Sequence, residues 1–328
     1  MAEIAVLGLG NWGTALANHL AWKGHNVLGW SIDPGVPEAI NSTHRNPIYL
    51  NEFELNSTLK ATSVLHDAAS RPVLVLVIPS GALQELVPKL ELKAKTLVVS
   101  AVKGIDPASL KTPLQIIDQF YPQHNRKAVL SGPSFAKDVV QRKPCGVVCA
   151  ASEESVAKEA ADLFSSEWAK VYTSTDPIGV ELGGILKNVI ALAAGMSDGL
   201  NLGDSARAGL ITRGLAEMVR LATAMGAHPR TLFGLSGLGD LVMTASVDQS
   251  RNRTVGLRLG KGEKLEAIVA SLGSTAEGVK TAEPVLRLAR EHGIEMPITE
   301  HISRLLKGEI TAIEGMKALM SRPVKAEF

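Results

Sequence analysis

Ile4-Ala5-Val6-Leu7-Gly8-Leu9-Gly10-Asn11-Trp12-Gly13 is the most informative part of the sequence for the architecture of the first half of the chain. An apolar run leads directly into a G-x-G-x-x-G pattern, and a helix-like stretch follows it to about Trp22. This order predicts a strand, a tight turn and a helix, the arrangement that binds the diphosphate of a dinucleotide. Gly8 would permit the turn, Gly10 would let the diphosphate approach the backbone, and Gly13 would let the helix pack close to the strand.

Short apolar runs alternate with helix-like stretches beyond this motif, which predicts strand–helix units on a parallel sheet. The run Val73–Ile78 is apolar at every position, as expected for a strand that helices cover on both faces. The predicted strands are Ile4–Leu7, Asn26–Trp30, Val73–Ile78, Thr96–Ala101 and Ala128–Leu130, with Gly146–Ala150 and Lys170–Thr173 as edge strands.

The second half of the chain has a different pattern, because its apolar residues recur at helical spacing from Pro177 onward. Further helices are predicted at Arg207–Met225, Val255–Lys261, Leu265–Ala270, Thr281–Glu291, Glu300–Lys307 and Ile313–Met320. The sequence therefore predicts an α/β Rossmann-type domain with a mostly parallel, doubly wound sheet over residues 1–178, followed by an all-α catalytic and substrate-binding domain over residues 179–328.

The composition is that of an ordinary globular protein, with 45% hydrophobic and 20% charged residues. A formal net charge of +1 argues against a protein-wide attraction to nucleic acid or to an anionic membrane. The apolar N-terminus lacks the basic leader of a signal peptide, and Val73–Ile78 is far shorter than the roughly 20 residues of a membrane span. We expect a cytoplasmic protein that binds no nucleic acid, does not insert into a membrane and acts on a small ligand.

The chain has two cysteines, Cys145 and Cys149, too few for a disulfide framework, and this low count suits a reducing compartment. No second pair or histidine cluster accompanies them, so their spacing does not indicate a metal site. We expect both side chains to be buried and structural, and we expect no metal.

Asp33 bears on the choice between NAD(H) and NADP(H). An acidic residue about 20 positions after the glycine motif would bind the ribose hydroxyls and favour NAD(H). Alternatively, Asp33 is only a turn residue before Pro34. No Arg or Lys lies between Gly24 and His44 to bind a 2′-phosphate, although Arg45 could reach in from a loop. The sequence therefore slightly favours NAD(H) and leaves NADP(H) open.

Several polar residues stand where their neighbours do not explain them. Lys187 lies in an otherwise apolar helical stretch, where it either extends to solvent or is partly desolvated. Desolvation lowers the pKa of a lysine, which would suit a proton donor. Lys103 and the segment Ser131-Gly132-Pro133-Ser134 each follow a predicted strand, at the end where open α/β sheets bind ligands. An ordinary loop lysine and an ordinary turn remain the alternatives.

Asp240 and the run Ser250-Arg251-Asn252-Arg253 complete this set. A guanidinium such as that of Arg251 can bind a phosphate through two parallel, charge-assisted hydrogen bonds. Taken alone, the run could equally be a solvated basic turn.

Together these motifs resemble the bacterial NAD(P)-dependent glycerol-3-phosphate dehydrogenase family, in the family's order and over nearly the whole chain. The matching blocks are Gly8–Gly13, Val102–Gly104, Ser131–Ala136, Gly184–Asn188, Gly237–Leu241 and Gln249–Asn252, and Ala193–Gly199 and Ile211–Glu217 are also similar. The resemblance implies reversible reduction of dihydroxyacetone phosphate to sn-glycerol 3-phosphate, which feeds phospholipid synthesis. A homodimer is common among such enzymes.

The resemblance also implies roles for individual residues. Lys187 matches the general acid/base, and Lys103 matches a residue near both substrate and cofactor. Substrate-binding positions match Lys103, Gly132, Ser134, Lys187, Asp240, Ser250, Arg251 and Asn252, of which Arg251 and Asn252 are the candidates for the phosphate. Cofactor-contacting positions match Asn11, Trp12, Tyr49, Lys103, Ala136, Arg251 and Glu277, in addition to Gly8, Gly10, Gly13 and Asp33.

The pair Ile32-Asp33 departs from many bacterial members, which carry a basic or histidine pair here. An acid should repel a 2′-phosphate, so we hypothesise a preference for NADH. Two alternatives remain, a dehydrogenase of the same plan that acts on keto or hydroxy acids and a non-enzymatic dinucleotide sensor. The Ser250-Arg251-Asn252 block argues against the first, and Lys187 argues against the second.

Overall fold

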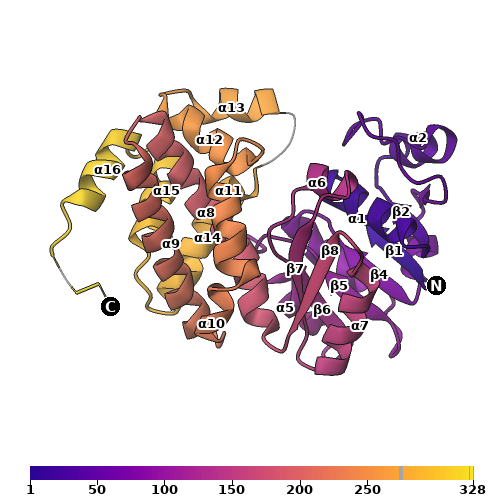
Figure 1. Ribbon diagram of the computed structural model, residues 1–328. Coiled ribbons are helices and arrows are strands. Elements are labelled where there is room, and N and C mark those ends of the chain that lie inside the picture. Colours follow the sequence, from indigo (N-terminus) through magenta and orange to yellow (C-terminus); the bar gives the residue numbers. More distant parts are fainter. Residues whose placement is uncertain (273–275, 325, 328) are drawn as a thin grey trace. The chain divides into compact units, whose positions relative to one another are not determined.

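The computed structural model describes residues 1–272, 276–324 and 326–327. Contacts divide the chain into two compact units. The first comprises residues 1–106 and 111–181, and the second comprises residues 107–110 and the chain from Leu182 onward. The chain passes from the first unit to the second within helix α8 (Pro177–Gly199). Figure 1 colours the chain along the sequence and labels this helix.

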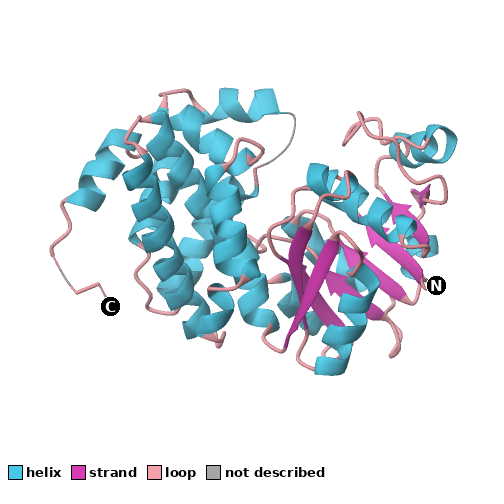
Figure 2. Cartoon of the chain, in the orientation of Figure 1, coloured by secondary structure: helices cyan, strands magenta, loops and turns pink. Residues whose placement is uncertain are grey.

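The first unit contains an eight-stranded sheet in the order β3-β2-β1-β4-β5-β6-β7-β8. Every neighbouring pair is parallel except β6 and β7, which are antiparallel. This confirms the predicted Rossmann-type, mostly parallel sheet, which Figure 2 shows in magenta. The strands are β1 (Glu3–Leu7), β2 (Asn26–Trp30), β3 (Lys60–Thr62), β4 (Val73–Leu76), β5 (Leu97–Ser100), β6 (Lys127–Ser131), β7 (Cys145–Ala150) and β8 (Ala169–Ser174).

The strand order reverses between β1 and β4, and this fixes where the glycine motif lies. Leu7 at the end of β1 is in register with Trp30 of β2 on one side and with Leu76 of β4 on the other. Gly8 thus leaves the sheet at the carboxyl ends of three parallel strands. In open α/β sheets this switch point is the place where ligands bind.

Two strand predictions need correction. Gly146–Ala150 was expected at an edge of the sheet, but β7 lies inside it because β8 pairs with its outer side. The opposite edge is β3, which was not predicted because its three residues are too few to show a periodicity. The remaining predicted strands are confirmed to within two residues at their ends.

Helices of the first unit connect the strands. α1 contacts α6 and α7, and its residues Ala15, Leu16, Ala17 and Leu20 belong to the hydrophobic core. The helices are α1 (Asn11–Trp22), α2 (Gly35–Thr43), α3 (Leu65–Ala69), α4 (Leu83–Leu86), α5 (Pro113–Phe120), α6 (Ala136–Val140) and α7 (Glu154–Phe164), with short 3₁₀ turns η1 (Ser80–Ala82) and η2 (Val87–Lys89).

The described residues of the second unit form helices joined by loops, without strands, which confirms the predicted all-α region (Figure 2). After α8 come α9 (Asp204–Ala224), α10 (Pro229–Leu232), a π-helical turn η3 (Leu235–Gly239), α11 (Asp240–Ser246), α12 (Arg251–Gly260), α13 (Leu265–Leu272), α14 (Glu277–Glu291), α15 (Pro297–Leu306) and α16 (Ala312–Met320). The short segments α10, η3 and α11 were not predicted, since each is too brief to show a helical repeat.

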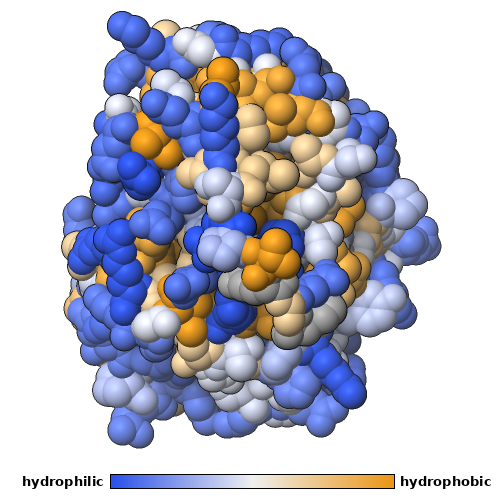
Figure 3. All heavy atoms as spheres, turned by 90° about the vertical axis from the view of Figure 1, so that its left-hand side faces the viewer, coloured by the Kyte–Doolittle hydropathy of each residue, from blue (hydrophilic) through white to orange (hydrophobic). Residues whose placement is uncertain are grey.

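Helix α8 is long and apolar enough to cross a membrane by length and composition, but 94% of its most apolar window is buried inside the structure. A helix that is apolar on all sides is buried in a core or in a lipid bilayer, and here protein atoms cover it. Figure 3 shows one face of the molecule, where hydrophilic residues surround smaller hydrophobic clusters. α8 is therefore a core helix.

Candidate functional site

The three glycines of the motif each have a distinct geometric reason. Gly8 has φ +107°, and a Cβ there would lie 2.7 Å from the Val77 carbonyl oxygen. A Cβ on Gly13 would lie 1.7 Å from the Gly8 carbonyl oxygen, so only glycine lets α1 pack this close to the turn. A Cβ on Gly10 would meet nothing within 4 Å. The open space beside Gly10 fits a dinucleotide, whose diphosphate must approach the backbone there.

Helix α1 offers an anion-compatible N-terminus next to this open space. Gly10 is its N-cap, no side chain caps its first turn, and that turn carries no acidic residue. The first N–H groups of a helix lack intrahelical acceptors, and the helix dipole places positive charge at that end. The turn and the helix start are therefore suited to a diphosphate.

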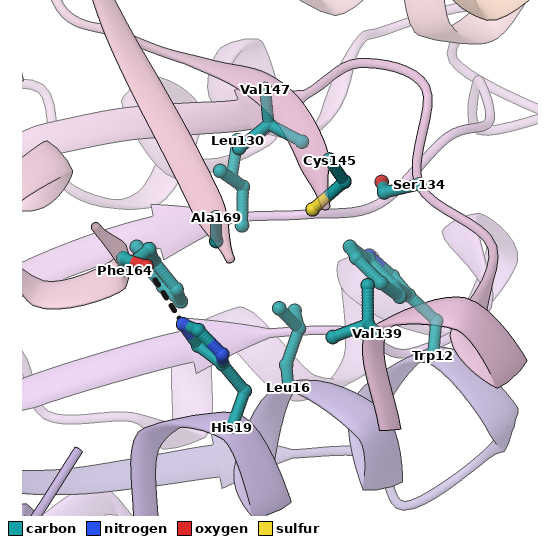
Figure 4. A pocket seen from close by; sticks show the side chains of 10 residues that line it. All are labelled: Trp12, Leu16, His19, Leu130, Ser134, Val139, Cys145, Val147, Phe164 and Ala169. Atoms are coloured by element: carbon teal, nitrogen blue, oxygen red, sulfur yellow. Dashed lines mark hydrogen bonds between the residues drawn. The ribbon is translucent and has the colours of Figure 1, made fainter. Parts of the chain in front are cut away.

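Trp12 and Ser134 line one small cavity of the first unit, as Figure 4 shows. The Trp12 Nε1 is buried and has no hydrogen-bond partner within the described part of the chain. The Ser134 hydroxyl donates to the Gly132 carbonyl oxygen at 3.1 Å. The cavity is lined by Trp12, Leu16, His19, Leu130, Ser134, Val139, Cys145, Val147, Phe164 and Ala169. A buried indole N–H without an acceptor in the chain is unusual, but the small cavity beside it exposes only apolar atoms, so we assign it no polar ligand.

Cys145 also lines this cavity, and its burial corrects one expectation. Cys149 is fully buried, as expected, but Cys145 is only partly buried. Burial and the nearby Asp138 carboxylate raise the pKa of the Cys145 thiol. A thiol of raised pKa is a poor nucleophile, so the site gives Cys145 no chemical role.

The loops after β5 and β6 are joined by a hydrogen bond, as expected for the ends of neighbouring parallel strands. The Lys103 Nζ donates to the Gly132 carbonyl oxygen at 3.2 Å. Gly132 has φ +138°, and a Cβ there would lie 2.9 Å from the Val147 Cα, so the position requires glycine. The first unit therefore brings together Lys103, Gly132 and Ser134, and Ala136 follows at the start of α6.

Asp33 is exposed, and its Oδ1 accepts a hydrogen bond from the Gly35 N–H at 3.0 Å. The Oδ1 thus serves the turn that starts α2, and a hydrogen bond to this one oxygen excludes neither of the two interpretations that the sequence left open. Tyr49 is partly buried in the loop after α2, and its N–H donates to the Asn46 Oδ1 at 3.0 Å. Arg45 donates to the Asn51 carbonyl oxygen at 3.3 Å.

In the second unit, Lys187 of α8 is buried and paired. Its Nζ lies 2.9 Å from the Asp240 Oδ1 and donates to the Thr244 Oγ1 at 2.6 Å. Lys187 is 6% exposed and Asp240 is fully buried, so the lysine does not extend to solvent. Thr244 was missed by the sequence analysis. Its position four residues after Asp240, on the same face of a helix, is the signal that could have found it.

Asp240 reaches Lys187 because glycines allow close backbone contacts around the turn η3. A Cβ on Gly237 would lie 2.0 Å from the Leu232 carbonyl oxygen, and one on Gly183 would lie 2.7 Å from the Ser236 carbonyl oxygen. α8 and η3 therefore touch backbone to backbone. Isolated π-helical turns of this kind are frequent at functional sites.

A chain of amide hydrogen bonds joins α8, α12 and α14. The Asn252 Nδ2 donates to the Asn188 Oδ1 at 2.8 Å, and the Gly278 N–H donates to the Asn252 Oδ1 at 2.9 Å. Close packing fixes this arrangement, because a Cβ on Gly256 of α12 would lie 2.0 Å from the Leu192 carbonyl oxygen of α8. Asn252 is thus held rigidly, and Asn188, a neighbour of Lys187 that was not among the predicted site residues, holds it.

Arg251 is the exposed first residue of α12, and the hydroxyl of Ser250 caps this helix by accepting from the Arg253 N–H at 3.2 Å. Burial raises the pKa of Glu277, while the positive charges of Lys280 and Arg251 oppose that rise. The second unit therefore brings Arg251 into electrostatic contact with Glu277. No cluster of three or more metal-ligating side chains occurs among the described residues.

Comparisons with known proteins agree with this geometry. Two family models match, NAD-dependent glycerol-3-phosphate dehydrogenase N-terminus over residues 3–157 and the corresponding C-terminus over residues 176–317. The chain is 47% identical to the glycerol-3-phosphate dehydrogenase [NAD(P)+] of Geobacter metallireducens, over 99% of this chain and 98% of that protein. It is 46% identical to the same enzyme of Nitratidesulfovibrio vulgaris, over 99% of this chain and 100% of that protein.

A solved structure gives the same result. The chain resembles the crystal structure of glycerol-3-phosphate dehydrogenase from Coxiella burnetii with a TM-score of 0.94 and 37% identity, over 98% of this chain and 99% of that one. The two family models, the relatives and this structure all match nearly the full length. The resemblance drawn from the sequence motifs is therefore confirmed, and the chain belongs to the NAD-dependent glycerol-3-phosphate dehydrogenase family.

Proposed function

We propose that this chain catalyses the reversible, NAD(P)H-dependent reduction of dihydroxyacetone phosphate to sn-glycerol 3-phosphate and so supplies glycerophospholipid synthesis. The observation that carries the proposal is the buried pair of Lys187 and Asp240 in a chain whose full-length relatives bear that enzyme's name. Buried, paired titratable groups cluster at functional sites, so this lysine is the candidate proton donor.

The first unit would hold the cofactor through Gly8, Gly10, Asn11, Trp12 and Gly13. The N–H groups at the start of α1 would bind the diphosphate, and the open space at Gly10 would admit it. The further proposed contacts are Asp33, Tyr49, Lys103, Ala136, Arg251 and Glu277. When bound, the reduced nicotinamide supplies the hydride that adds to C2 of the substrate.

Lys187 would donate its Nζ proton to the C2 oxygen of dihydroxyacetone phosphate as that oxygen becomes an alkoxide. In the reverse direction the neutral amine would take the same proton from the C2 hydroxyl. Asp240 and Thr244 would hold the Nζ in one position, because both accept from it within hydrogen-bond distance. Each turnover in the reducing direction then consumes one hydride and one proton.

Two further interactions would stabilise negative charge on the substrate, one at its phosphate and one at its C2 oxygen. The Arg251 guanidinium and the Asn252 amide would bind the substrate phosphate. The Asn252 side chain is already held in place by its hydrogen bonds to Asn188 and Gly278. The Lys103 ammonium would stabilise the developing oxyanion. Gly132, Ser134 and Ser250 complete the proposed substrate-binding set.

We also propose that the protein prefers NADH, that it is cytoplasmic and that it forms a homodimer. The exposed carboxylate of Asp33 would repel the 2′-phosphate of NADPH and accept hydrogen bonds from free ribose hydroxyls. An advantage of about tenfold or more for NADPH in kcat/KM would overturn the preference without touching the reaction itself.

A spectrophotometric assay at about 340 nm, where reduced nicotinamide absorbs, tests the function with purified protein. Dihydroxyacetone phosphate should be reduced rapidly and unphosphorylated dihydroxyacetone slowly, because the latter cannot use Arg251. The assay compares NADH with NADPH and includes a 2-keto acid. Turnover of the keto acid alone would point to a dehydrogenase of another class. Tight NADH binding without any turnover would point to a dinucleotide sensor.

A further inference from the structure

A buried asparagine outside the proposed contact residues ties together two parts of the cofactor site. Asn46 lies in the loop after α2 and is fully buried. Its Nδ2 donates to the Leu9 carbonyl oxygen at 3.0 Å and to the Thr14 Oγ1 at 2.9 Å. Its Oδ1 accepts from the Ile48 N–H at 3.1 Å and from the Tyr49 N–H at 3.0 Å. Both N–H donors and both acceptor positions of this one amide are thus used.

The Leu9 carbonyl oxygen accepts from two buried side chains. The Thr14 hydroxyl donates to it at 3.0 Å, in addition to the Asn46 amide. Leu9 is the residue between the first two glycines of the motif. These bonds therefore fix the orientation of the peptide plane between Leu9 and Gly10.

The orientation of that plane decides what the turn offers to a ligand. None of the described peptide bonds is cis, and in a planar trans peptide the C=O and the following N–H point in opposite directions. Because the Leu9 carbonyl points inward to Asn46 and Thr14, the Gly10 N–H points away from them. A flip of this plane would turn a carbonyl oxygen, instead of an N–H, toward a bound diphosphate, and a partial negative charge there would repel it.

We propose that Asn46 is a positioning residue for the cofactor: with Thr14 it locks the Leu9–Gly10 peptide so that its N–H faces the diphosphate, and it fixes the Tyr49 backbone to the same turn. The inference rests on the proposed dinucleotide function of this turn. Asn46 touches no reacting atom. Its removal should weaken cofactor binding and leave the proton-transfer step unchanged.

Asn41, which is exposed, offers a control with the same hydrogen-bonding chemistry. Its side chain also donates to a backbone carbonyl oxygen, that of Ala61 at 2.8 Å, and accepts from the Ala61 N–H at 3.0 Å. It lies in the same unit, on α2, but makes none of these contacts to the glycine turn. Asn41→Asp and Asn46→Asp are therefore the same chemical change at two side chains that bind backbone groups, and only Asn46 binds the glycine turn.

The experiment measures NADH affinity by fluorescence titration without substrate, together with kcat, the two KM values and Tm. Asn46→Asp keeps the acceptor for Ile48 and Tyr49 but loses the donor to Leu9, and we expect its Kd for NADH to rise about tenfold or more. The KM for NADH should rise in parallel, with kcat at saturating NADH and the KM for dihydroxyacetone phosphate nearly unchanged. Asn41→Asp should lower Tm with little change in Kd.

Thr14→Val provides a second variant that introduces no charge. It removes the hydroxyl that donates to the Leu9 carbonyl oxygen and that accepts from the Asn46 Nδ2, while the Asn46 donor to Leu9 remains. We expect a rise in Kd of roughly threefold. Because this variant carries no new carboxylate, repulsion between an added negative charge and the diphosphate cannot cause that rise. Folded Asn46→Asp and Thr14→Val proteins that bind NADH as the parent does would overturn the inference, as would an equal loss in Asn41→Asp. Failure of the unaltered protein to bind NADH would instead overturn the proposed function.

Discussion

The Nζ of Lys187 and the Oδ1 of Asp240 lie 2.9 Å apart, and both side chains are buried within the helical unit. Two opposite charges taken out of water remain stable only when they are well paired and hydrogen-bonded. Thr244 completes the pairing by donating to the Asp240 Oδ1 at 3.1 Å. The arrangement holds a lysine at one point in a core where it would otherwise be unfavourable, and it yields two predictions.

Replacing Lys187 by Met should abolish most turnover while leaving cofactor binding intact. Proton transfer by a positioned side chain contributes about 10²–10⁴-fold to rate, so kcat should fall by at least about a hundredfold. Steady-state kinetics with dihydroxyacetone phosphate measure this fall, and NADH titration provides the control. A variant that retains more than about a tenth of the parent kcat would rule out Lys187 as the proton donor.

Asp240→Asn should destabilise the protein more than the double variant Lys187→Met/Asp240→Asn does. Removing one partner leaves an unpaired buried charge, which costs roughly 3–5 kcal/mol, whereas removing both charges avoids that penalty. Urea or thermal unfolding of the parent, both single variants and the double variant gives the coupling free energy. Additive losses would mean that the pair contributes no coupling in solution.

Alanine substitutions at two glycines of the turn should differ in their effects on folding and on NADH binding. Gly10→Ala places its methyl in open space at a φ of −70°, so the variant should fold with a nearly unchanged Tm and bind NADH about tenfold or more weakly. Gly13→Ala drives a methyl into the Gly8 carbonyl oxygen and should fail to fold or lose much of its stability. Circular dichroism melts and NADH titrations of the two variants distinguish the roles. Normal NADH affinity in Gly10→Ala would argue against a diphosphate at this turn.

Arg251→Gln should raise the KM for dihydroxyacetone phosphate. Charge-assisted hydrogen bonds contribute about 1.5–3 kcal/mol, which corresponds to a rise of roughly 10–100-fold. Arg258→Gln, on the same helix but paired with Glu263, is the control and should leave KM unchanged. At saturating NADH, the weak reduction of unphosphorylated dihydroxyacetone should be insensitive to Arg251→Gln. An equal loss with both substrates would assign Arg251 to the cofactor alone.

The stability of the helical unit should depend on pH because of the Glu217 carboxyl group. Its carboxyl accepts from the Ile298 and Thr299 N–H groups at the start of α15, and burial raises its pKa to about 7. The folded state therefore binds a proton that the unfolded chain, with a pKa of about 4.3, has released. The associated stability is fully present below the unfolded pKa and is lost as the pH rises through about 7.

The parent Tm should consequently fall between about pH 4.5 and pH 7 by more than that of Glu217→Gln, which cannot ionise. Melting curves of the two proteins across this range provide the measurement. Parallel curves would show that Glu217 does not titrate in this window. Gln also loses one acceptor for Thr299, which lowers Tm at every pH. The test is therefore the slope of Tm against pH and not Tm itself.

The fold was predictable from the sequence where its signal is local. Val73–Leu76 is apolar at every position, as expected for a strand that is buried on both faces. The glycine motif predicts a turn from only a few consecutive residues. The three-residue β3 and the interior place of β7 were not predictable. Strand order depends on which distant segments pair, and no short stretch records it.

For the candidate site, the residue types and their order could be predicted from the sequence: the glycines, Lys103, Lys187, Asp240 and the Ser250–Asn252 block. The burial of Lys187 against Asp240 and Thr244, and the hydrogen bond from Asn46 to the Leu9 carbonyl oxygen, are visible only in the folded chain. These partners lie 53, 57 and 37 positions away along the chain. Local periodicity extends over a few residues, whereas the contacts that fix a buried polar group form only when separate helices and loops pack together.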